Sequence, residues 1–167
     1  MQEIAKFFKV STIQFKKDFD PQMDIIKAGE LLESISIPKR STSGSAGYDF
    51  VSSKDFILNP GETIIIPTGI RCRIDEGWFL MLAPRSGLGF KYRLQLDNTV
   101  GIIDSDYFSA ENEGHIMIKL TNDSKNDKSL EVKFGEKIAQ GIFIPYGVVK
   151  EDDADGKRTG GFGSTGR

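Results

Sequence analysis

Residues 98–107 of the 167-residue chain read Asn98-Thr99-Val100-Gly101-Ile102-Ile103-Asp104-Ser105-Asp106-Tyr107. The β-branched residues favour a strand, and Asn98 and Gly101 favour a tight turn at its start. The stretch therefore predicts a β-hairpin arm that delivers two carboxylates, Asp104 and Asp106, beside a tyrosine. A carboxylate on a rigid hairpin can accept a proton from water as a general base, whereas in an Asx-type turn the same acids would only be solvated.

The segments on either side of this stretch continue the β pattern. Apolar side chains alternate with polar ones, and turn-forming residues recur every 8–12 residues from residue 37 onward. The strand-like segments are residues 48–51, 63–74, 78–83, 116–121 and 137–145, and residues 94–107 are expected to form a central hairpin. This spacing is typical of a sandwich, jelly roll or barrel, so we expect an all-β domain with one or two short helices.

The expected helices lie near residues 24–36 and 86–92. Asp24 is a suitable N-cap for the first, although Gly29 lowers its helix propensity, and Ser86 is a suitable cap for the second. The apolar face of the first helix would consist of Ile25, Ile26, Leu31 and Leu32. Residues 1–20 alternate short apolar pairs with lysines, which suits an edge strand.

Composition limits the function classes. An apolar content of 38% in 167 residues suits one domain rather than two cores. With 22 basic and 24 acidic residues, the chain has no electrostatic footprint for duplex nucleic acid or an anionic membrane. No apolar run approaches the roughly 20 residues of a membrane span, and the first ten residues are too weakly apolar for a signal peptide. These features predict a cytoplasmic protein that binds neither nucleic acid nor membrane.

The chain has one cysteine and one histidine. Cys72 alternates with Ile70 and Ile74, so we expect a buried thiol, and a single cysteine excludes an intramolecular disulfide or a CxxC metal site. The single histidine, His115, excludes a His-rich metal cluster. A carboxylate–His–Ser triad is possible only if His115 itself serves in it.

Residues 151–167 have a composition unlike the rest of the chain. Phe162 is their only large apolar residue, and five glycines stand among charged and hydroxyl residues. Such a segment buries too little surface to offset its ordering entropy, so we expect a mobile arm. Residues 161–166 have the letters of G-x-G-x-x-G without the helix that a dinucleotide site needs. The segment is either a Gly/Ser tail or an arm whose amides and Arg158 close over phosphates while Phe162 covers a ring.

Two further features carry possible binding groups. Residues 84–87, Pro-Arg-Ser-Gly, offer amides, the Ser86 hydroxyl and the Arg85 guanidinium to an anion, or form an ordinary capped turn. Gln140 interrupts an apolar strand, so it either bonds a neighbouring backbone group or points into a site.

Five segments, taken together and in this order, resemble the family of trimeric dUTP pyrophosphatases (dUTPases). They are residues 45–50 (SAGYDF), 84–89 (PRSGLG), 98–107, 135–140 (GEKIAQ) and 158–166 (RTGGFGSTG). The resemblance covers residues 38–167 and implies a distorted jelly-roll or β-barrel-like fold. It also implies an N-terminal extension packed on the domain (1–37), a catalytic domain (38–150) and a flexible arm that closes the active site (151–167).

The resemblance implies a dUTP diphosphatase, which hydrolyses dUTP at the α-phosphorus to dUMP and pyrophosphate. Such an enzyme keeps uracil out of DNA and supplies dUMP for thymidylate synthesis. Asp104 matches the family's general base, and Tyr107 matches the ring that packs against the deoxyribose and excludes a 2′-hydroxyl. Asp49 matches the acid that supports Mg²⁺ through water, the ion being held mainly by the substrate phosphates.

The other substrate-binding positions also follow from the resemblance. The uracil-reading positions are Asn98, Gly101, Ile102, Ile103 and Met117. The phosphate-binding positions are Arg85, Ser86, Gly87 and Gln140. The arm positions are Arg158 for the triphosphate, Phe162 for stacking on uracil, and Gly163 and Ser164. A homotrimer is implied, in which each site takes its first, second and fourth segments from one subunit, the third from another and the arm from the last.

Some positions depart from the family's pattern. Residues 108–115 form a longer acidic loop, and Lys157 precedes Arg158 and could share its role. Two rival functions would use a similar fold. A dCTP deaminase would need an acid in the strand at residues 114–120, which contains none. A dUTP-responsive regulatory protein on the same fold would be expected to lack Asp104, Arg85 or the arm, and all are present.

Overall fold

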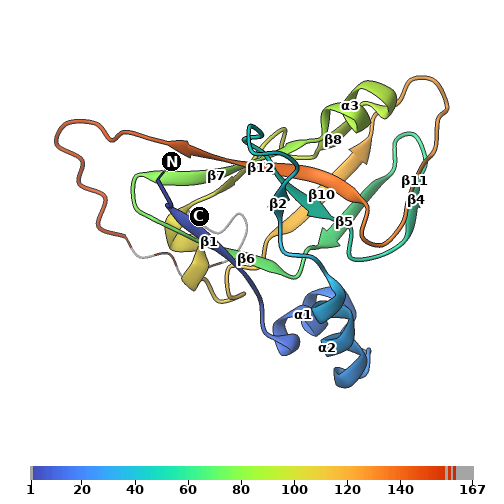
Figure 1. Cartoon of the computed structure of the whole chain (residues 1–167), viewed down its shortest axis with the longest axis horizontal. Helices are drawn as coiled ribbons and strands as arrows, with labels where there is room; N and C mark the ends of the chain where they lie inside the picture. The colour runs from blue at the N-terminus through green and yellow to red at the C-terminus, as the bar shows by residue number, and fades with distance from the viewer. Residues whose placement is uncertain (1, 157, 159, 161–167) are drawn as a thin grey trace.

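The computed structural model describes residues 2–156, 158 and 160 (Figure 1). Most of its regular elements are strands. In chain order the elements are β1 (Ala5–Lys9), α1 (Thr12–Phe19), α2 (Ile25–Ser34), β2 (Lys39–Arg40), β3 (Tyr48–Val51), β4 (Phe56–Leu58), β5 (Thr63–Pro67), β6 (Ile70–Ile74), β7 (Trp78–Pro84), α3 (Ser86–Tyr92), β8 (Leu94–Leu96), β9 (Gly101–Ile103), the 3₁₀-helix η1 (Ser105–Ser109), β10 (Met117–Asn122), β11 (Leu130–Val132) and β12 (Lys137–Pro145).

The strands form four antiparallel groups. The largest sheet has the order β2-β3-β12-β7-β9, and the others are β5-β10-β8, β1-β6 and β11-β4. The buried faces of these strands share one apolar core. Along β6 the side chains of Ile70, Cys72 and Ile74 are all buried, as their alternation predicts, and burial raises the pKa of the Cys72 thiol to about 12. The all-β prediction is confirmed.

The helices differ in part from the prediction, because the described residues form three α-helices rather than one or two. The additional helix, α1, occupies residues expected to be strand. Its Ser11 cap accepts from the Gln14 amide, and it buries Phe15 while Ile13 is 75% exposed. The apolar side chains of α1 therefore show no clear helical period in the sequence, and packing of Phe15 against the core stabilises the helix.

Helix α2 begins where the sequence predicts. The Asp24 carboxylate accepts from the amides of Ile26 and Lys27 at 2.9 and 3.1 Å. Its predicted apolar face is wrong in part, because Ile25 and Ile26 are exposed whereas Ala28 and Leu32 are fully buried. α1 and α2 lie side by side at one end of the molecule (Figure 1). None of the helices in the described part of the chain is long and apolar enough to cross a bilayer.

The stretch predicted as a central hairpin is a crossing between two sheets. β8 pairs with β10, whereas β9 pairs with β7. The two arms are joined to each other by a single bridge between Leu96 and Thr99, where Thr99 has a φ of +65°. Each arm therefore satisfies its backbone groups with a different neighbour, and the crossing carries the chain from the β5-β10-β8 sheet to the edge of the five-stranded sheet.

The N-terminal segment (residues 1–37) contributes to the same core as the strands. β1 pairs with β6, and Val10, Phe15, Leu32 and Ile35 are each at most 4% exposed. Gly69, between β5 and β6, has a φ of +72°, and a Cβ there would lie 2.7 Å from Leu32 Cδ1. This glycine both makes the turn and allows α2 to approach it closely. The domain boundary at residue 37 stays a prediction.

Replacing Gly141 with alanine is expected to destabilise the fold by about 1–3 kcal/mol. Gly141 lies at the centre of the five-stranded sheet, where a Cβ would be 2.8 Å from Leu80 Cδ1 and 3.0 Å from Phe50 Cε2, both in the core. Urea unfolding measures the loss, with Gly147→Ala as the control because its Cβ would meet nothing within 4 Å. Equal unfolding midpoints for the two variants would contradict the prediction.

Candidate active site

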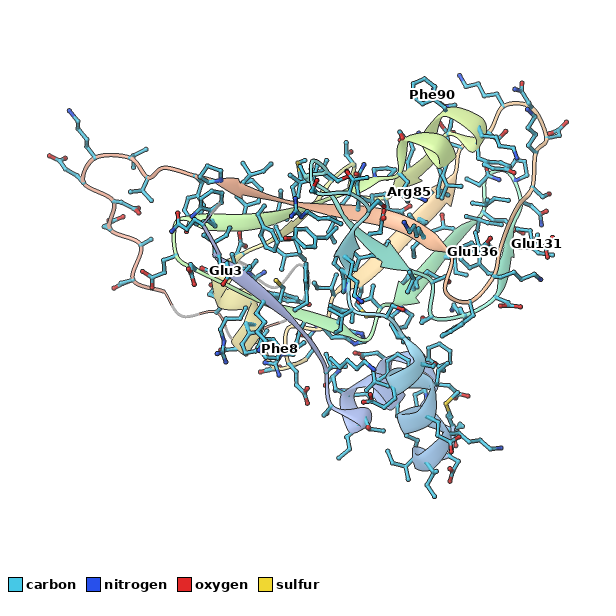
Figure 2. All side chains as sticks on the ribbon, viewed as in Figure 1. Glu3, Phe8, Arg85, Phe90, Glu131 and Glu136 are labelled. Atoms are coloured by element: carbon cyan, nitrogen blue, oxygen red, sulfur yellow. The ribbon has the colours of Figure 1, made fainter. Side chains whose placement is uncertain are left out.

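Three neighbouring strands bring the predicted phosphate-binding residues together. Asp49 on β3 is opposite Gln140 on β12, and Gln140 is opposite Ala83 on β7, two residues before Arg85. Arg85 lies where β7 leads into α3 (Figure 2). A hollow of about 400 Å³ opens here, lined by Ser41, Ser45, Ala46, Gly47, Asp49, Arg85, Ser86, Gln140 and Ile142. We call this hollow the cradle.

The charges of the cradle are paired around Asp49. Its carboxylate lies 3.2 Å from Arg85 Nε and 2.7 Å from Lys137 Nζ, and it accepts from Ser41 Oγ at 2.7 Å. Partial burial alone would raise the pKa of Asp49, but the hydrogen bonds from Lys137 and Ser41 and the charge of Arg85 lower it. Two cations around one carboxylate leave a net positive group, which suits an anionic ligand.

The start of α3 differs from the prediction in one residue. Arg85 is the N-cap and Ser86 is the first helical residue, so the Ser86 side chain is not the cap. The amides of Ser86 and Gly87 belong to the first turn of the helix, where no intrahelical acceptor is available. Both residues are exposed, so their amides can face a ligand.

The Gln140 side chain both bonds a neighbouring backbone group and points into the site, the two roles that its position in the sequence suggested. Its Nε2 donates to the Pro84 carbonyl at 3.2 Å, and its side chain lines the cradle. A Cβ at residue 47 would lie 2.5 Å from Gln140 Oε1. Only glycine at residue 47 therefore leaves this position of Gln140 undisturbed.

A second cluster forms at the far end of β9. Arg158 Nη1 donates to Asp104 Oδ2 at 3.0 Å and to Asp106 Oδ1 at 3.1 Å. The guanidinium also lies over the Tyr107 ring, 5.0 Å from its centroid. The carboxylates are about half exposed, whereas the Arg158 side chain is only 10% exposed. Burial alone would lower the pKa of Arg158, but the two carboxylates raise it.

The remaining residues of the crossing are divided between core and solvent. Gly101 and Ile103 are buried, whereas Asn98 and Ile102 are exposed. A Cβ at Gly101 would lie 3.0 Å from Leu82 Cβ, so the glycine allows β9 to pack closely on β7. Met117 is half-buried at the start of β10.

The cradle and the Asp104 cluster lie at opposite ends of β7. Ile103 pairs with Leu80, and Arg85 comes five residues after Leu80, just beyond the end of β7. At about 3.3 Å per residue, Asp104 and Arg85 of one chain are separated by about 20 Å. The sheet of a single chain therefore holds the predicted base and the predicted cradle apart.

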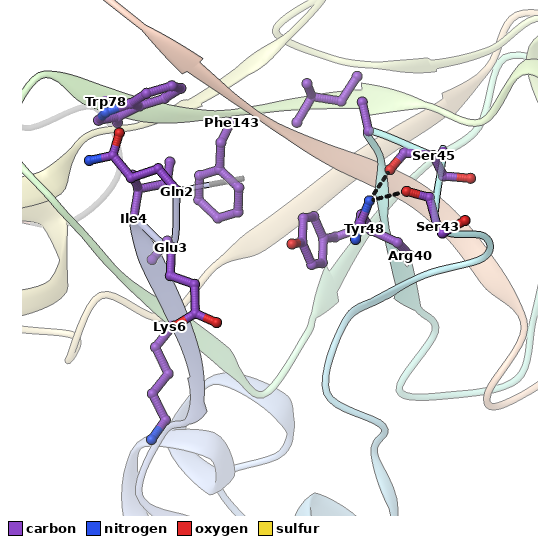
Figure 3. A pocket seen from close by; sticks show the side chains of 14 residues that line it. Gln2, Glu3, Ile4, Lys6, Arg40, Ser43, Ser45, Tyr48, Trp78 and Phe143 are labelled. Carbon is purple, nitrogen blue, oxygen red and sulfur yellow. Dashed lines mark hydrogen bonds between the residues drawn. The ribbon is translucent and has the colours of Figure 1, made fainter.

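A larger hollow of about 1060 Å³ lies beside the cradle. It shares Ser45, Ala46 and Ile142 with the cradle but contains none of the predicted site residues. Figure 3 shows Arg40 on its wall, donating to the carbonyls of Ser43 and Ser45 at 2.8 and 3.0 Å. Arg40 therefore shapes the loop that separates the two hollows.

A family model described as dUTPase matches residues 33–166. The chain belongs to the dUTPase family. The deoxyuridine 5′-triphosphate nucleotidohydrolase of Lactococcus lactis is 42% identical over 135 residues, covering 79% of this chain and 89% of the relative. The protein of the same name from Hahella chejuensis is 39% identical over 140 residues, covering 79% and 88%.

Solved structures of the family share the fold. The dUTPase from Streptococcus mutans is 30% identical, with a TM-score of 0.63, covering 86% of this chain and 97% of that one. The dUTPase of Staphylococcus bacteriophage 80alpha with dUpNHpp is 24% identical, with a TM-score of 0.64, covering 99% and 100%. The predicted dUTPase fold is confirmed. The family match begins at residue 33, after α1 and most of α2.

Two residues that contact Asp49 in this member of the dUTPase family were not predicted as site residues from the sequence. Lys137 and Ser41 both contact Asp49, and Lys137 Nζ also donates to Ser41 Oγ at 2.9 Å. Lys137 lies three residues before Gln140, which in a regular strand would put the two side chains on opposite faces. A register irregularity between Lys137 and Ala139 breaks this rule, and no local signal in the sequence marks it. The predicted arm residues Phe162, Gly163 and Ser164 lie outside the described residues.

Replacing Asp49 with asparagine is expected to lower the free energy of unfolding near neutral pH, with the difference from wild type shrinking below about pH 4. Because the pKa of Asp49 is lowered from 3.8 in the folded protein, its carboxylate stabilises the fold above that value. The contribution is lost as the pH falls through the folded-state pKa. Urea unfolding at several pH values measures this, and a difference independent of pH would contradict it.

Proposed function

We propose that this chain is a dUTP diphosphatase that releases dUMP and pyrophosphate by attack of water on the α-phosphorus. The observation that carries the proposal is the combination of a cationic cradle with an exposed, strand-mounted carboxylate in a chain of the dUTPase family. The relatives that share about 40% of their residues with it are named for this reaction. The product dUMP would feed thymidylate synthesis, and loss of dUTP would keep uracil out of DNA.

Asp104 is proposed as the general base. It follows β9 directly and its side chain is 52% exposed, so water can reach it while the sheet fixes its backbone. A general base must lie within hydrogen-bond reach of the water that it deprotonates. Arg158 neutralises this carboxylate in the structure, and we propose that the guanidinium moves to the triphosphate when substrate binds.

The cradle is proposed to hold the phosphates. The Arg85 guanidinium presents a fork of donors that matches phosphate oxygens, and the amides of Ser86 and Gly87 and the Gln140 side chain add uncharged donors. Lys137 keeps Asp49 ionised and in place. These contacts orient the triphosphate and offset the charge that develops as pyrophosphate leaves.

A magnesium ion fits this donor set only if the substrate supplies most of its ligands. Both oxygens of Asp49 already contact cations, and the described residues contain no group of three His, Cys, Asp or Glu that could hold a metal. Asp49 is the acid that lines the cradle, and we propose that it supports the ion through water. When bound, the ion would orient the triphosphate and stabilise the leaving pyrophosphate.

The base and sugar are proposed to lie against the crossing between β8 and β9. Asn98, the backbone of residues 101–103 and Met117 would read uracil, because a site built on hydrogen bonds leaves its own groups unpaired when cytosine enters. Tyr107 would pack against the deoxyribose. The proposed uracil contact of Phe162, with Gly163 and Ser164, lies outside the described residues.

A homotrimer with shared sites is proposed from the resemblance to the dUTPase family, and the distance between the two clusters supports the sharing of sites between subunits. The attacking water and the phosphorus must approach within about 3–3.5 Å, but Asp104 and Arg85 of one chain are about 20 Å apart. The cradle of one subunit would therefore be completed by the Asp104 cluster of a second subunit. The mass of the assembly by light scattering tests this.

The deciding experiment measures pyrophosphate release from dUTP, dCTP, dTTP and UTP with Mg²⁺, together with ammonia release from dCTP. Release from dUTP alone, abolished by a chelator, supports the proposal. Ammonia from dCTP would indicate a deaminase. Binding of dUTP without any release would favour the alternative, a dUTP-responsive regulatory protein on the same fold.

A further inference from the structure

The loop at residues 108–115 joins the N-terminal helices to the residue proposed to pack against the deoxyribose. It begins inside η1, directly after Tyr107, and ends at His115 before β10. Its last residue, His115, contacts Asp18 of α1 through its side chain and accepts from the Tyr107 hydroxyl through its carbonyl. The loop is therefore the physical link between the N-terminal segment and the Asp104 cluster.

The His115 ring is held through both of its nitrogens. Nε2 lies 2.8 Å from the Gly69 amide, which can only donate, so Nε2 is the acceptor. The ring proton therefore lies on Nδ1, which donates to Asp18 Oδ2 at 2.5 Å. Gln14 donates to the same oxygen at 2.7 Å. Burial alone would raise the pKa of Asp18, but these hydrogen bonds lower it, which keeps the carboxylate an acceptor.

This Asp–His pair has the geometry of a catalytic dyad without access to substrate. The His115 side chain is fully buried, and its second nitrogen is already occupied by the Gly69 amide. A general base needs a free nitrogen within reach of a reacting proton. His115 is therefore excluded from the triad that the sequence left open.

The fixed imidazole ring of His115 positions the backbone carbonyl of the same residue. The His115 carbonyl accepts from the Tyr107 hydroxyl at 2.8 Å, and Asn112 Nδ2 donates to that hydroxyl at 2.8 Å. Tyr107 is only 2% exposed, and its amide donates to the carbonyl of Asp104 at 3.2 Å. The position of the Tyr107 ring therefore depends on the backbone carbonyl of His115, a residue whose side chain is bonded to Asp18 of α1.

A second contact ties the same loop to the N-terminal segment. The Glu113 carboxylate accepts from the Ser11 amide at 2.8 Å and from the Ser11 hydroxyl at 2.6 Å. Ser11 is the N-cap of α1, so the loop is attached to both ends of that helix. α1 thus positions the loop as a unit.

We infer that Asp18 is a positioning residue that sets the Tyr107 ring through His115, and that the N-terminal segment thereby contributes to discrimination between deoxyribose and ribose. This inference rests on the proposed function, because it requires Tyr107 to pack against the sugar. Asp18 touches no substrate. It acts only through His115 and, through His115, on Tyr107. A ring displaced by a fraction of an ångström would leave room for a 2′-hydroxyl.

The test compares kcat/KM for dUTP and UTP in wild type, Asp18→Ala, Asp18→Asn and Asn112→Ala. Asp18→Ala removes the acceptor of His115 Nδ1 and is expected to lower the dUTP-to-UTP ratio by about tenfold, since a misplacement of about 1 Å can cost about 10²-fold. Asp18→Asn retains an acceptor and should restore most of the ratio. Asn112→Ala loosens the Tyr107 hydroxyl from the other side and should lower the ratio independently.

The matched control is Glu30→Gln on α2, which removes an exposed carboxylate from the neighbouring helix and should leave the ratio unchanged. Melting temperatures are measured for every variant, and the assays are run well below them. A lower melting temperature with an unchanged dUTP-to-UTP ratio in both alanine variants would show that Asp18 and Asn112 have a merely structural role. That outcome would overturn the inference but not the proposed function. Absence of pyrophosphate release by wild type would refute the proposed function, and the inference with it.

Discussion

Replacing Asp104 with asparagine is expected to lower turnover of dUTP by about 10²–10⁴-fold, with binding of dUTP retained. The amide cannot accept the proton of the attacking water, but it is nearly the same size as the carboxylate. Asp104 is about half exposed at the end of β9, so its loss should change the free energy of unfolding by less than about 0.5 kcal/mol. Pyrophosphate release, isothermal titration with a non-hydrolysable analogue and urea unfolding measure the three quantities.

The matched control is Asp106→Asn, which removes the other carboxylate bound by Arg158. The two residues have similar exposure and the same cationic partner, so loss of charge beside Arg158 is common to both variants. If loss of charge were the cause, the two variants would lose similar activity. Normal turnover by the Asp104 variant would remove Asp104 from the role of base.

Replacing Arg85 with lysine is expected to lower kcat/KM for dUTP by about 10²–10³-fold, the cost of losing one preorganised donor to the reacting group. Lysine keeps the charge but lacks the planar fork that binds two phosphate oxygens at once. It also loses the Nε contact with Asp49 at 3.2 Å, which fixes the side chain beside the cradle. Steady-state kinetics with dUTP separate the effects on KM and kcat.

Arg93→Lys provides the control for this substitution. Arg93 lies at the opposite end of α3, is 57% exposed and pairs with Asp123 rather than with a cradle residue. Its replacement should leave kcat/KM unchanged. Equal losses in the two variants would indicate that α3 is sensitive to any change of arginine and that Arg85 has no special contact with phosphate.

Much of the fold was predictable because its signals are local. Alternation along residues 70–74 predicted the buried face of β6 and the buried Cys72. Asp24 predicted the start of α2, because a capping carboxylate acts on amides only two and three residues away. The motifs that identify the family were visible for the same reason, since each is a continuous segment.

Predictions failed where tertiary contacts override local preference. Helix α1 forms although its apolar residues show no clear period, because Phe15 packs into the core and Asp18 bonds His115. The two arms of the expected hairpin, β8 and β9, belong to different sheets. β8 pairs with β10 and β9 pairs with β7, and each of these partners is longer than the opposite arm. Strand alternation could not reveal which neighbour each arm would choose.

The sequence by itself determined the family, the predominance of strands and the chemical groups that the site offers. Only the tertiary structure decided how those groups are combined. Lys137 joins Asp49 across a strand irregularity, and Asp18 reaches His115 over a separation of 97 residues. Contacts of this kind depend on how whole sheets and helices pack, so no pattern of neighbouring residues can specify them.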